Sequence, residues 1–489
     1  MCRKDIVAAF DGDVPFPVYC NECWWSDKWD PLKYGQDYDF NRAFFPQFQE
    51  LLNKVPKVGQ LQLSNENTEY SNYTAYSKNT YMCAGSFKME DCYYARKSRD
   101  CKDCMDSNFI DSCELVSSSI NCFKCYNSDN LANCRNCTDC SYISDSISCE
   151  SCFMCSGISN KKYNFKNKQL SQEDYENVLK EYQNRTPEEK SREFQEFNKT
   201  VPKRYQNQLN CEKSSGDYIQ NCKNATECYD SFDIEDSKHV IESYDLKDSM
   251  DVSCFDKNNE LCYEVSSGGE SNYNLKFSFC SCASPESTYL YSCFFLSDSF
   301  GCDGIHFKNK NCILNKKYSA EEYTKLKDKI IEHMKSTGEW GEYFPIQLSL
   351  YPYNHTLAQD YHPLTGDEAR KKGYKWADKD QKFYQPATIN LPDRIKDIPD
   401  SITKEILACQ ECGRNYRITK QELELHRKIK APISVYCPDC RQVKLLAQKN
   451  PRKLFDRKCD KCGVAIKTTY APDRPETVYC EKCYLDTVY

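Results

Sequence analysis

The sequence predicts a mostly β fold with helical caps, in which two Cys-rich β-solenoid (β-helix) segments are flanked by small metal-binding ribbons. Three observations lead to this prediction. Small or apolar residues occupy every third position from Ser71 to Ile158, thirty in a row and without a charge. The three-residue spacing returns in a second tract after residue 221. Pairs of cysteines in CxxC spacing gather at both ends of the chain.

A spacing of three fits neither a long α-helix nor a flat strand. In a helix of ~3.6 residues per turn the spacing drifts around the axis, and in a strand odd spacings alternate between faces. Collagen requires glycine at every third position, but the tract has only Gly85 and Gly157, both off this frame. The remaining option is a solenoid with short straight edges and frequent corners, in which each edge turns one residue inward.

Residues of one type in the first tract also recur at a spacing of 21. Cysteines and serines both follow this step, namely Cys92, Cys113, Cys134 and Cys155, and Ser86, Ser107 and Ser128. We therefore expect each coil to span one such step, with Cys92, Cys113 and Cys134 stacked on adjacent coils. The in-frame cysteines of residues 83–155 are expected to be free, buried and inward. Asn121, Asn133 and Asn136 beside the frame suit corners.

The chain contains an internal duplication. The second tract runs from Cys222 to Val252 and, after a slip, from Ser284 to Ile305, and both tracts end in Asn-Lys-x-x-Ser-x-Glu-x-Tyr. Ser171 and Ser319 in these ends predict helix N-caps. The expected organisation is a partial zinc ribbon (1–30), a capping helix region (31–63), the first solenoid (64–170), a helical connector (171–210), the second solenoid (211–318), a helical cap and Pro-rich linker (319–400) and a double zinc-ribbon domain (401–489).

Composition indicates a cytoplasmic protein. Thirty-four cysteines in 489 residues would be typical of a secreted disulfide protein. However, Met1-Cys2-Arg3-Lys4-Asp5 opens no apolar signal region. No run reaches the ~18 apolar residues of a membrane span, and CxxC pairs of the zinc type favour a reducing compartment.

The charge is segregated along the chain. Residues 211–306 hold 18 acidic residues against 6 lysines, and residues 401–489 hold 18 basic residues against 11 acidic ones. The C-terminal end is therefore suited to phosphate groups, which the second solenoid would repel. Basic residues on and between the C-terminal knuckles are the candidate nucleic-acid-binding set, namely Arg414, Arg417, Arg427, Lys428, Arg441, Lys444, Arg452 and Lys453. A solvated charged face is the alternative.

Four CxxC pairs near the C-terminus predict two metal sites. Two knuckles complete a tetrahedral Cys₄ set, and sequential pairing gives one site from Cys409, Cys412, Cys437 and Cys440 and another from Cys459, Cys462, Cys480 and Cys483. Zn²⁺ is the expected ion. Disulfides and buried thiols are the alternatives, and iron–sulfur ligation lacks the clustered ferredoxin spacing.

The N-terminus repeats half of this pattern. Cys2, Cys20 and Cys23 match Cys462, Cys480 and Cys483 in spacing, and both CxxC pairs follow Val-Tyr. A third zinc site is therefore expected, whose fourth ligand lies upstream of a truncated start or is a water or another side chain. No general base that would make an open zinc catalytic is apparent nearby.

Other features give weaker signals. Trp24, Trp25 and Trp29 could stack on bases or on a peptide. More often such a cluster fills the junction between a ribbon and the first coil. His355 and His362 lie seven residues apart. They could bind one metal ion together, but structural polar contacts are the favoured interpretation. The sequence holds no P-loop, Rossmann glycine pattern, GxSxG or HExxH motif.

The chain also resembles an uncharacterised Cys-rich zinc-ribbon protein family of candidate-phyla bacteria. The resemblance rests on the string Trp24-Trp25-Ser26-Asp27-Lys28-Trp29-Asp30-Pro31-Leu32-Lys33-Tyr34-Gly35, on the cysteine triplets, on the two Asn-Lys-x-x-Ser ends and on Cys437-Pro438-Asp439-Cys440-Arg441. It covers nearly the whole chain. It implies a full ribbon before the tryptophans, which supports a truncated start, and it implies no activity.

The function expected from the sequence is that of a non-enzymatic zinc-binding scaffold, whose basic ribbons in 401–489 contact nucleic acid or a ribonucleoprotein. One alternative is an acidic solenoid that binds a protein partner or mimics nucleic acid. A further alternative is a carbohydrate-acting β-helix enzyme, which would need export and a convergent acidic cluster. No membrane contact is expected.

Overall fold

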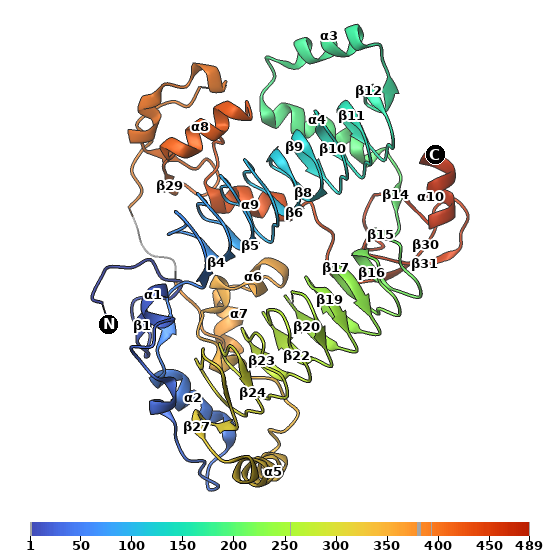
Figure 1. Cartoon of the computed structure of the whole chain (residues 1–489). Helices are drawn as coiled ribbons and strands as arrows, with labels where there is room; N and C mark the ends of the chain where they lie inside the picture. Colours follow the sequence, from blue (N-terminus) through green and yellow to red (C-terminus); the bar gives the residue numbers. More distant parts are fainter. Residues whose placement is uncertain (1, 255, 379–382, 393, 489) are drawn as a thin grey trace.

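The computed structural model describes residues 2–254, 256–378, 383–392 and 394–488. It confirms a mostly β fold with two solenoids, helical caps and terminal cysteine clusters. The second solenoid runs beside the first in the opposite direction, as the order of the strand labels in Figure 1 shows. Within the described residues, none of the helices has both the length and the apolar character that crossing a membrane requires.

The elements of the first solenoid are short parallel strands that pair from coil to coil. They are β3 (Gln62–Leu63), β4 (Asn72–Ala75), β5 (Ala84–Phe87), β6 (Asn108–Asp111), β7 (Glu114–Ser117), β8 (Ile120–Phe123), β9 (Tyr126–Ala132), β10 (Ser141–Ser144), β11 (Glu150–Ser156) and β12 (Lys162–Phe165), closed by the antiparallel β13 (Lys168–Gln169).

The second solenoid is built in the same way. Its strands are β15 (Gln208–Leu209), β16 (Gly216–Gln220), β17 (Cys228–Glu235), β18 (Lys238–Ile241), β19 (Tyr244–Lys247), β20 (Met250–Ser253), β21 (Asn259–Glu260), β22 (Tyr263–Ser266), β23 (Lys276–Phe279), β24 (Leu296–Ser297), β25 (Asn309–Lys310), β26 (Cys312–Ile313) and the antiparallel β27 (Lys316–Lys317).

Helices and small hairpins complete the chain. The α-helices are α1 (Asn21–Trp24), α2 (Phe44–Lys54), α3 (Gln172–Tyr182), α4 (Pro187–Lys199), α5 (Ala320–Thr337), α6 (Leu357–Tyr361), α7 (Gly366–Lys371), α8 (Lys420–Lys428), α9 (Pro438–Leu446) and α10 (Glu481–Val488). Short 3₁₀ helices are η1 (Pro31–Tyr34), η2 (Ile346–Leu348), η3 (Tyr353–His355), η4 (Ile395–Asp397) and η5 (Asp400–Lys404). The remaining strands are β1 (Val18–Tyr19), β2 (Lys57–Val58), β14 (Lys203–Arg204), β28 (Leu407–Ala408), β29 (Asn415–Tyr416), β30 (Phe455–Lys458), β31 (Ala465–Thr468) and β32 (Val478–Tyr479).

The predicted coil length, a step of 21, is wrong, because neighbouring coils pair at a step of 12 in most of the solenoid. Asn72 pairs with Ala84, and Asn108 pairs with Ile120. The second solenoid inserts one residue in some coils, where Met250 pairs with Tyr263. A step of 21 residues equals two coils of 12 residues less one triplet of three. Cysteines separated by 21 residues therefore both point inward, but they lie on neighbouring sides of the coil and not above one another.

Each triplet consists of an inward residue, an extended residue and a corner residue. The corner residue adopts a left-handed backbone, with φ near +50° throughout the tract, and Asn121, Asn133 and Asn136 are corner residues as predicted. Asparagine visits this region more easily than most residues. The backbone groups beside a corner bond to the neighbouring coils, as when Tyr94 N donates to Tyr81 O and Tyr93 N donates to Cys104 O.

The in-frame cysteines of residues 83–155 are all free and buried, which confirms that part of the prediction. They do not stack in steps of 21. The thiol of Cys125 instead contacts those of Cys113 and Cys137, which lie one coil before and one coil after it. The core is therefore built from columns of small apolar side chains, together with residues such as Ile110 and Leu131.

The ends of each solenoid are closed by different means. At the first coil, Gln62 Nε2 donates to the carbonyl oxygens of Thr68 and Ser71, 2.8 and 2.6 Å away, so the core begins with polar groups that are satisfied. At the far ends lie α3 and α5, whose N-caps are Ser171 and Ser319 as predicted. An unpaired solenoid edge would otherwise favour association with other chains.

The two halves of the chain exchange helices, which the sequence did not predict. The helix α2, which precedes the first solenoid, packs on the second, where the Phe44 ring lies 5.1 Å from that of Tyr289. The helix α4, which precedes the second solenoid, packs on the first, where Phe194 lies 6.3 Å from Tyr142. In both cases the helix that precedes one solenoid packs on the other.

A lysine fixes each of these exchanges. Lys57 after α2 binds Asp303 of the second solenoid at 2.5 Å, with both side chains almost fully buried. Lys203 after α4 binds Asp145 of the first solenoid at 2.9 Å. Each lysine belongs to a Val-Pro-Lys sequence that leads into a solenoid.

Candidate metal centres

The first C-terminal site joins a hairpin to a helix. The hairpin β28–β29 brings Cys409 and Cys412 onto a tight knuckle, where Gly413 N donates to Cys409 O at 2.9 Å. Gly413 has a φ of +73°, which a residue with a Cβ adopts only with strain. Cys437 is the N-cap of α9 and Cys440 lies in its first turn.

The second C-terminal site repeats this construction. The hairpin β30–β31 carries Cys459 and Cys462, and Gly463 takes the position of Gly413 with a φ of +76°. Cys480 precedes α10 and Cys483 lies within it. In both sites a helix N-terminus points toward the thiols. Its first N–H groups have no partner within the helix, and the helix dipole makes this end positive.

The four sulfur atoms of each set converge. In both groups every Sγ lies within 4.8 Å of the other three. The Sγ atoms of Cys412 and Cys437 are 3.7 Å apart, and those of Cys462 and Cys480 are 3.8 Å apart. Sequential pairing of the CxxC motifs is therefore what the structure shows, and each set of donors fits a tetrahedral metal ion.

The N-terminal cysteines also converge. The Sγ atoms of Cys2, Cys20 and Cys23 lie within 4.8 Å of one another, and those of Cys2 and Cys20 are 3.7 Å apart. Cys20 is the N-cap of α1, as Cys437 is of α9. Among the described residues, the structure brings no fourth histidine, cysteine or carboxylate to this group.

Backbone N–H groups prepare one thiol of each C-terminal site for ionisation. Burial alone would raise the pKa of Cys409, but N–H groups of the two knuckles, among them that of Cys437, lower it to about 6. Cys459 has a pKa of about 6 for the same reasons. Burial and contacts with other thiols raise the pKa of Cys483 to about 12. Metal binding must therefore displace protons from the remaining thiols.

The ribbons dock on the solenoids in two ways. The strand β32 of the second ribbon pairs in parallel with β14, which leads into the second solenoid. The N-terminal knuckle does the same at the first solenoid, where β1 pairs with β2. In each case a cysteine knuckle is attached by main-chain hydrogen bonds to the segment that begins a solenoid.

The first ribbon instead docks through charged side chains on the outer wall of the first solenoid. Lys428 binds Asp103 at 2.5 Å, and Arg441 lies 3.1 Å from Asp106. The Arg441 guanidinium is also 4.7 Å from the centre of the Tyr94 ring. Burial raises the pKa of Glu422, which lies beside Arg441, to about 7.

The candidate nucleic-acid-binding residues thus have different environments. Three of the eight bind solenoid carboxylates: Lys428 and Arg441 as above, and Arg452, which binds Asp230 and Glu242. Two make ion pairs within the ribbon domain, namely Arg414 with Asp439 and Lys444 with Glu411, and Arg427 pairs with Asp400 at the end of the preceding linker. The side chains of Arg417 and Lys453 are exposed.

The tryptophan cluster fills a junction, but not the predicted one. Trp24 is 1% exposed, and its ring lies 4.6 Å from His306 and 5.9 Å from Phe294 of the second solenoid. The cluster therefore packs on the last coils of the second solenoid, because α2 and its surroundings are exchanged between the halves. His355 and His362 share no metal cluster within the described part of the chain.

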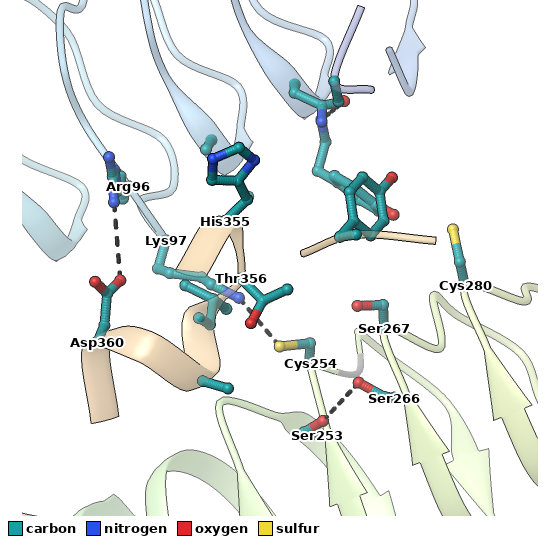
Figure 2. Close-up of a pocket in the computed structure, with 18 of the residues that line it drawn as sticks. Arg96, Lys97, Ser253, Cys254, Ser266, Ser267, Cys280, His355, Thr356 and Asp360 are labelled. Atoms are coloured by element: carbon teal, nitrogen blue, oxygen red, sulfur yellow. Dashed lines mark hydrogen bonds and ion pairs between the residues drawn. The ribbon is translucent and has the colours of Figure 1, made fainter. Parts of the chain in front are cut away.

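Sequence reasoning missed the cleft between the two solenoids. Its volume is about 3610 Å³, and both solenoids, the segment around α6 and the first ribbon line it. Figure 2 shows part of it, where Lys97 and Cys254 meet from opposite walls. The sequence signal was that Cys254, Cys280 and Cys282 lie outside the inward frame, since the antiparallel packing of the two solenoids has no local pattern.

Comparison of the chain with protein-family models and with curated proteins found no match in either case. The resemblance to zinc-ribbon proteins of candidate-phyla bacteria therefore stays an expectation.

Proposed function

We propose that this protein is a zinc-dependent scaffold, in which metal-loaded ribbons hold two antiparallel solenoids together and frame the cleft between them. Both C-terminal sets consist of four thiols, which is the donor set of structural zinc sites. A tetrahedral site with Zn–S bonds of about 2.3 Å places its sulfur atoms about 3.8 Å apart. The spacings of 3.7 and 3.8 Å in these sites agree with that value.

The pairing of β32 with β14 is the observation that carries the proposal. Lys203 N donates to Thr477 O at 2.7 Å and Tyr205 N donates to Tyr479 O at 3.0 Å. The second ribbon is therefore hydrogen-bonded, main chain to main chain, to the segment that leads into the second solenoid. The same ribbon reaches the first solenoid, since Tyr484 of α10 lies beside Gly157. One small module therefore contacts both solenoids.

Zinc would supply most of the order of such a module. A ribbon of this size has little apolar core, and zinc binding contributes about 10–16 kcal/mol in comparable small peptides. Loss of the ion should loosen the ribbon and its contacts, while the solenoids keep their own cores of buried cysteine, isoleucine and leucine.

Elemental analysis of protein purified without chelator tests the metal assignment. We expect two zinc ions per chain at the C-terminal sites, with a third where Cys2, Cys20 and Cys23 converge. Cys440→Ser should lower the zinc content by one, whereas Cys211→Ser, which changes a half-buried thiol outside the knuckles, should leave it unchanged. Fewer than two zinc ions per chain, or iron with sulfide, would refute the assignment.

Contact with nucleic acid or a ribonucleoprotein through 401–489 is a second proposal. It is supported by the exposed side chains of Arg417 and Lys453, which are not used to hold the solenoids. Titration with mixed RNA and DNA at low salt tests it, and each phosphate contact should add about one unit to the log–log salt slope. Arg417→Ala with Lys453→Ala should weaken binding regardless of base sequence. Absence of binding would leave only the scaffold proposal.

A further inference from the structure

Two rows of corner residues face each other where the solenoids meet. Tyr73 and Lys97 are corners of the first solenoid, and Glu242, Cys254 and Cys280 are corners of the second. All five line the cleft. Because corner side chains point away from the core, this is where chemically reactive groups of the two solenoids come together (Figure 2).

Lys97, Cys254 and Glu242 form a three-membered contact across this boundary. Lys97 Nζ lies 3.0 Å from Cys254 Sγ and 2.7 Å from Glu242 Oε2. Cys254 Sγ lies 3.1 Å from Glu242 Oε2. The lysine and the cysteine are 157 residues apart in sequence, so a bond between them would join the two solenoids covalently.

The surroundings hold the three groups in place. Arg452, from the segment between the two ribbons, binds Glu242, and its Nη2 lies 3.0 Å from the Tyr361 hydroxyl of α6. Arg452 also binds Asp230, the next corner along the same row. Glu242 therefore keeps a cationic partner even if Lys97 changes.

Cys254 differs from the cysteines of the core. The core thiols occupy inward positions, whereas Cys254 sits at a corner with a φ of +58° and lines an open cleft. A corner that holds cysteine instead of asparagine or glycine costs about 1 kcal/mol or more. Packing does not require a thiol at this position.

We propose that Lys97 and Cys254 form an oxidation-dependent covalent cross-link between the two solenoids, with hydrogen peroxide as the oxidant. Peroxide converts the Cys254 thiol to a sulfenic acid and is itself reduced to water. Lys97 Nζ then attacks Sγ, an S–N bond forms, and the sulfenic hydroxyl leaves as a second water molecule. In total, a thiol, an ammonium group and one peroxide give the sulfenamide, two waters and one proton.

The rate of this reaction should depend on pH. Burial and the charge of Glu242 raise the pKa of Cys254 to about 11, against the opposing effect of Lys97. Only the thiolate reacts with peroxide, so the oxidation of Cys254 should become about tenfold faster for each pH unit between pH 7 and 10. The second step follows the same direction, because, against the effect of burial, the charges of Cys254 and Glu242 raise the pKa of Lys97, and Lys97 must lose a proton before it attacks. Thiols with an ordinary pKa would level off near pH 9.

Mass spectrometry of peroxide-treated, full-length, zinc-loaded protein tests the proposal. A tryptic digest without reductant should contain one species that joins the peptides of Lys97 and Cys254, two hydrogen atoms lighter than their sum. Dithiothreitol should separate the two peptides. Trypsin should not cut after Lys97 in this species, because its amine is no longer free.

Three variants serve as controls. Cys254→Ser should lack the joined species. Lys97→Met should lack it too, and its Cys254 should be labelled by dimedone, a 1,3-dione that traps sulfenic acids, at several times the wild-type level. Cys282→Ser removes another thiol of the same cleft and should leave the joined species unchanged.

Three results would overturn the proposal: no joined species in the wild-type protein, equal dimedone labelling of wild type and Lys97→Met, or a joined species that persists in Cys254→Ser. None of them bears on the zinc sites, because the cross-link involves no cysteine of a knuckle.

Discussion

Replacement of Lys57 by methionine should destabilise the joint between the two halves severely. The Lys57 and Asp303 side chains are 3% and 0% exposed and 2.5 Å apart. Lys57 Nζ also donates to the carbonyl oxygens of Leu52 and Val55, at 2.7 and 2.8 Å. Methionine matches the length of lysine but leaves Asp303 buried without a counterion. Breaking a buried pair in this way costs about 3–5 kcal/mol.

The sign of the pH dependence follows from Asp303. Burial raises the pKa of Asp303 from 3.8 to about 6, although Lys57 opposes this. The folded state therefore binds more protons than the unfolded state between pH 4 and 6, and stability falls as pH rises through this window. Without Lys57 the folded-state pKa should rise further. The penalty of Lys57→Met should thus be larger at pH 7.5 than at pH 5.

Urea unfolding at both pH values, followed by tryptophan fluorescence, measures this effect, since Trp24 and Trp29 pack beside the joint. Lys316→Met is the matched control, because Lys316 and Asp37 are 43% and 79% exposed and water screens the attraction within such a pair. Lys57→Met with Asp303→Leu should recover much of the loss. A Lys57→Met protein as stable as the control, or equally destabilised at both pH values, would refute the reasoning.

Two further predictions concern the docking of the first ribbon and the solenoid core. Arg441→Met should expose Tyr94 and release the first ribbon, because Asp106 loses its cation and the cation–π contact with Tyr94 is lost. We expect faster proteolysis within 401–446 and an unchanged zinc content. Unchanged proteolysis would contradict this prediction. Thiol titration should find the 13 in-frame cysteines of 83–155 unreactive in the native protein and reactive in denaturant, and disulfides among them would contradict the buried, free core.

The sequence predicted local features well and long-range packing poorly. Inward cysteines, asparagine corners and paired knuckles were predictable, because each depends on residues a few positions apart. The coil length was not: Cys92, Cys113 and Cys134 are all inward, and a spacing of 21 satisfies the three-residue frame as well as 12 does. Only backbone pairing, as of Asn72 with Ala84, decides between them.

The roles of the charged residues could not be predicted either. Arg441, Lys428 and Arg452 are basic residues near zinc-type knuckles, which is also the composition of a phosphate-binding surface. In the structure they pair with Asp106, Asp103 and Asp230 of the two solenoids, which lie side by side with α2 and α4 exchanged between the halves. Local spacing holds no information on that exchange.

Hydrogen exchange with and without zinc tests most directly whether the ribbons hold the solenoids together. The N–H groups of Lys203 and Tyr205 bond to the second ribbon, whereas that of Phe123 bonds to Cys134 O within the first solenoid. After zinc is removed by a chelator, we predict much faster exchange at Lys203 and Tyr205 and unchanged exchange at Phe123. Equal protection of Lys203 and Tyr205 with and without zinc would contradict the account.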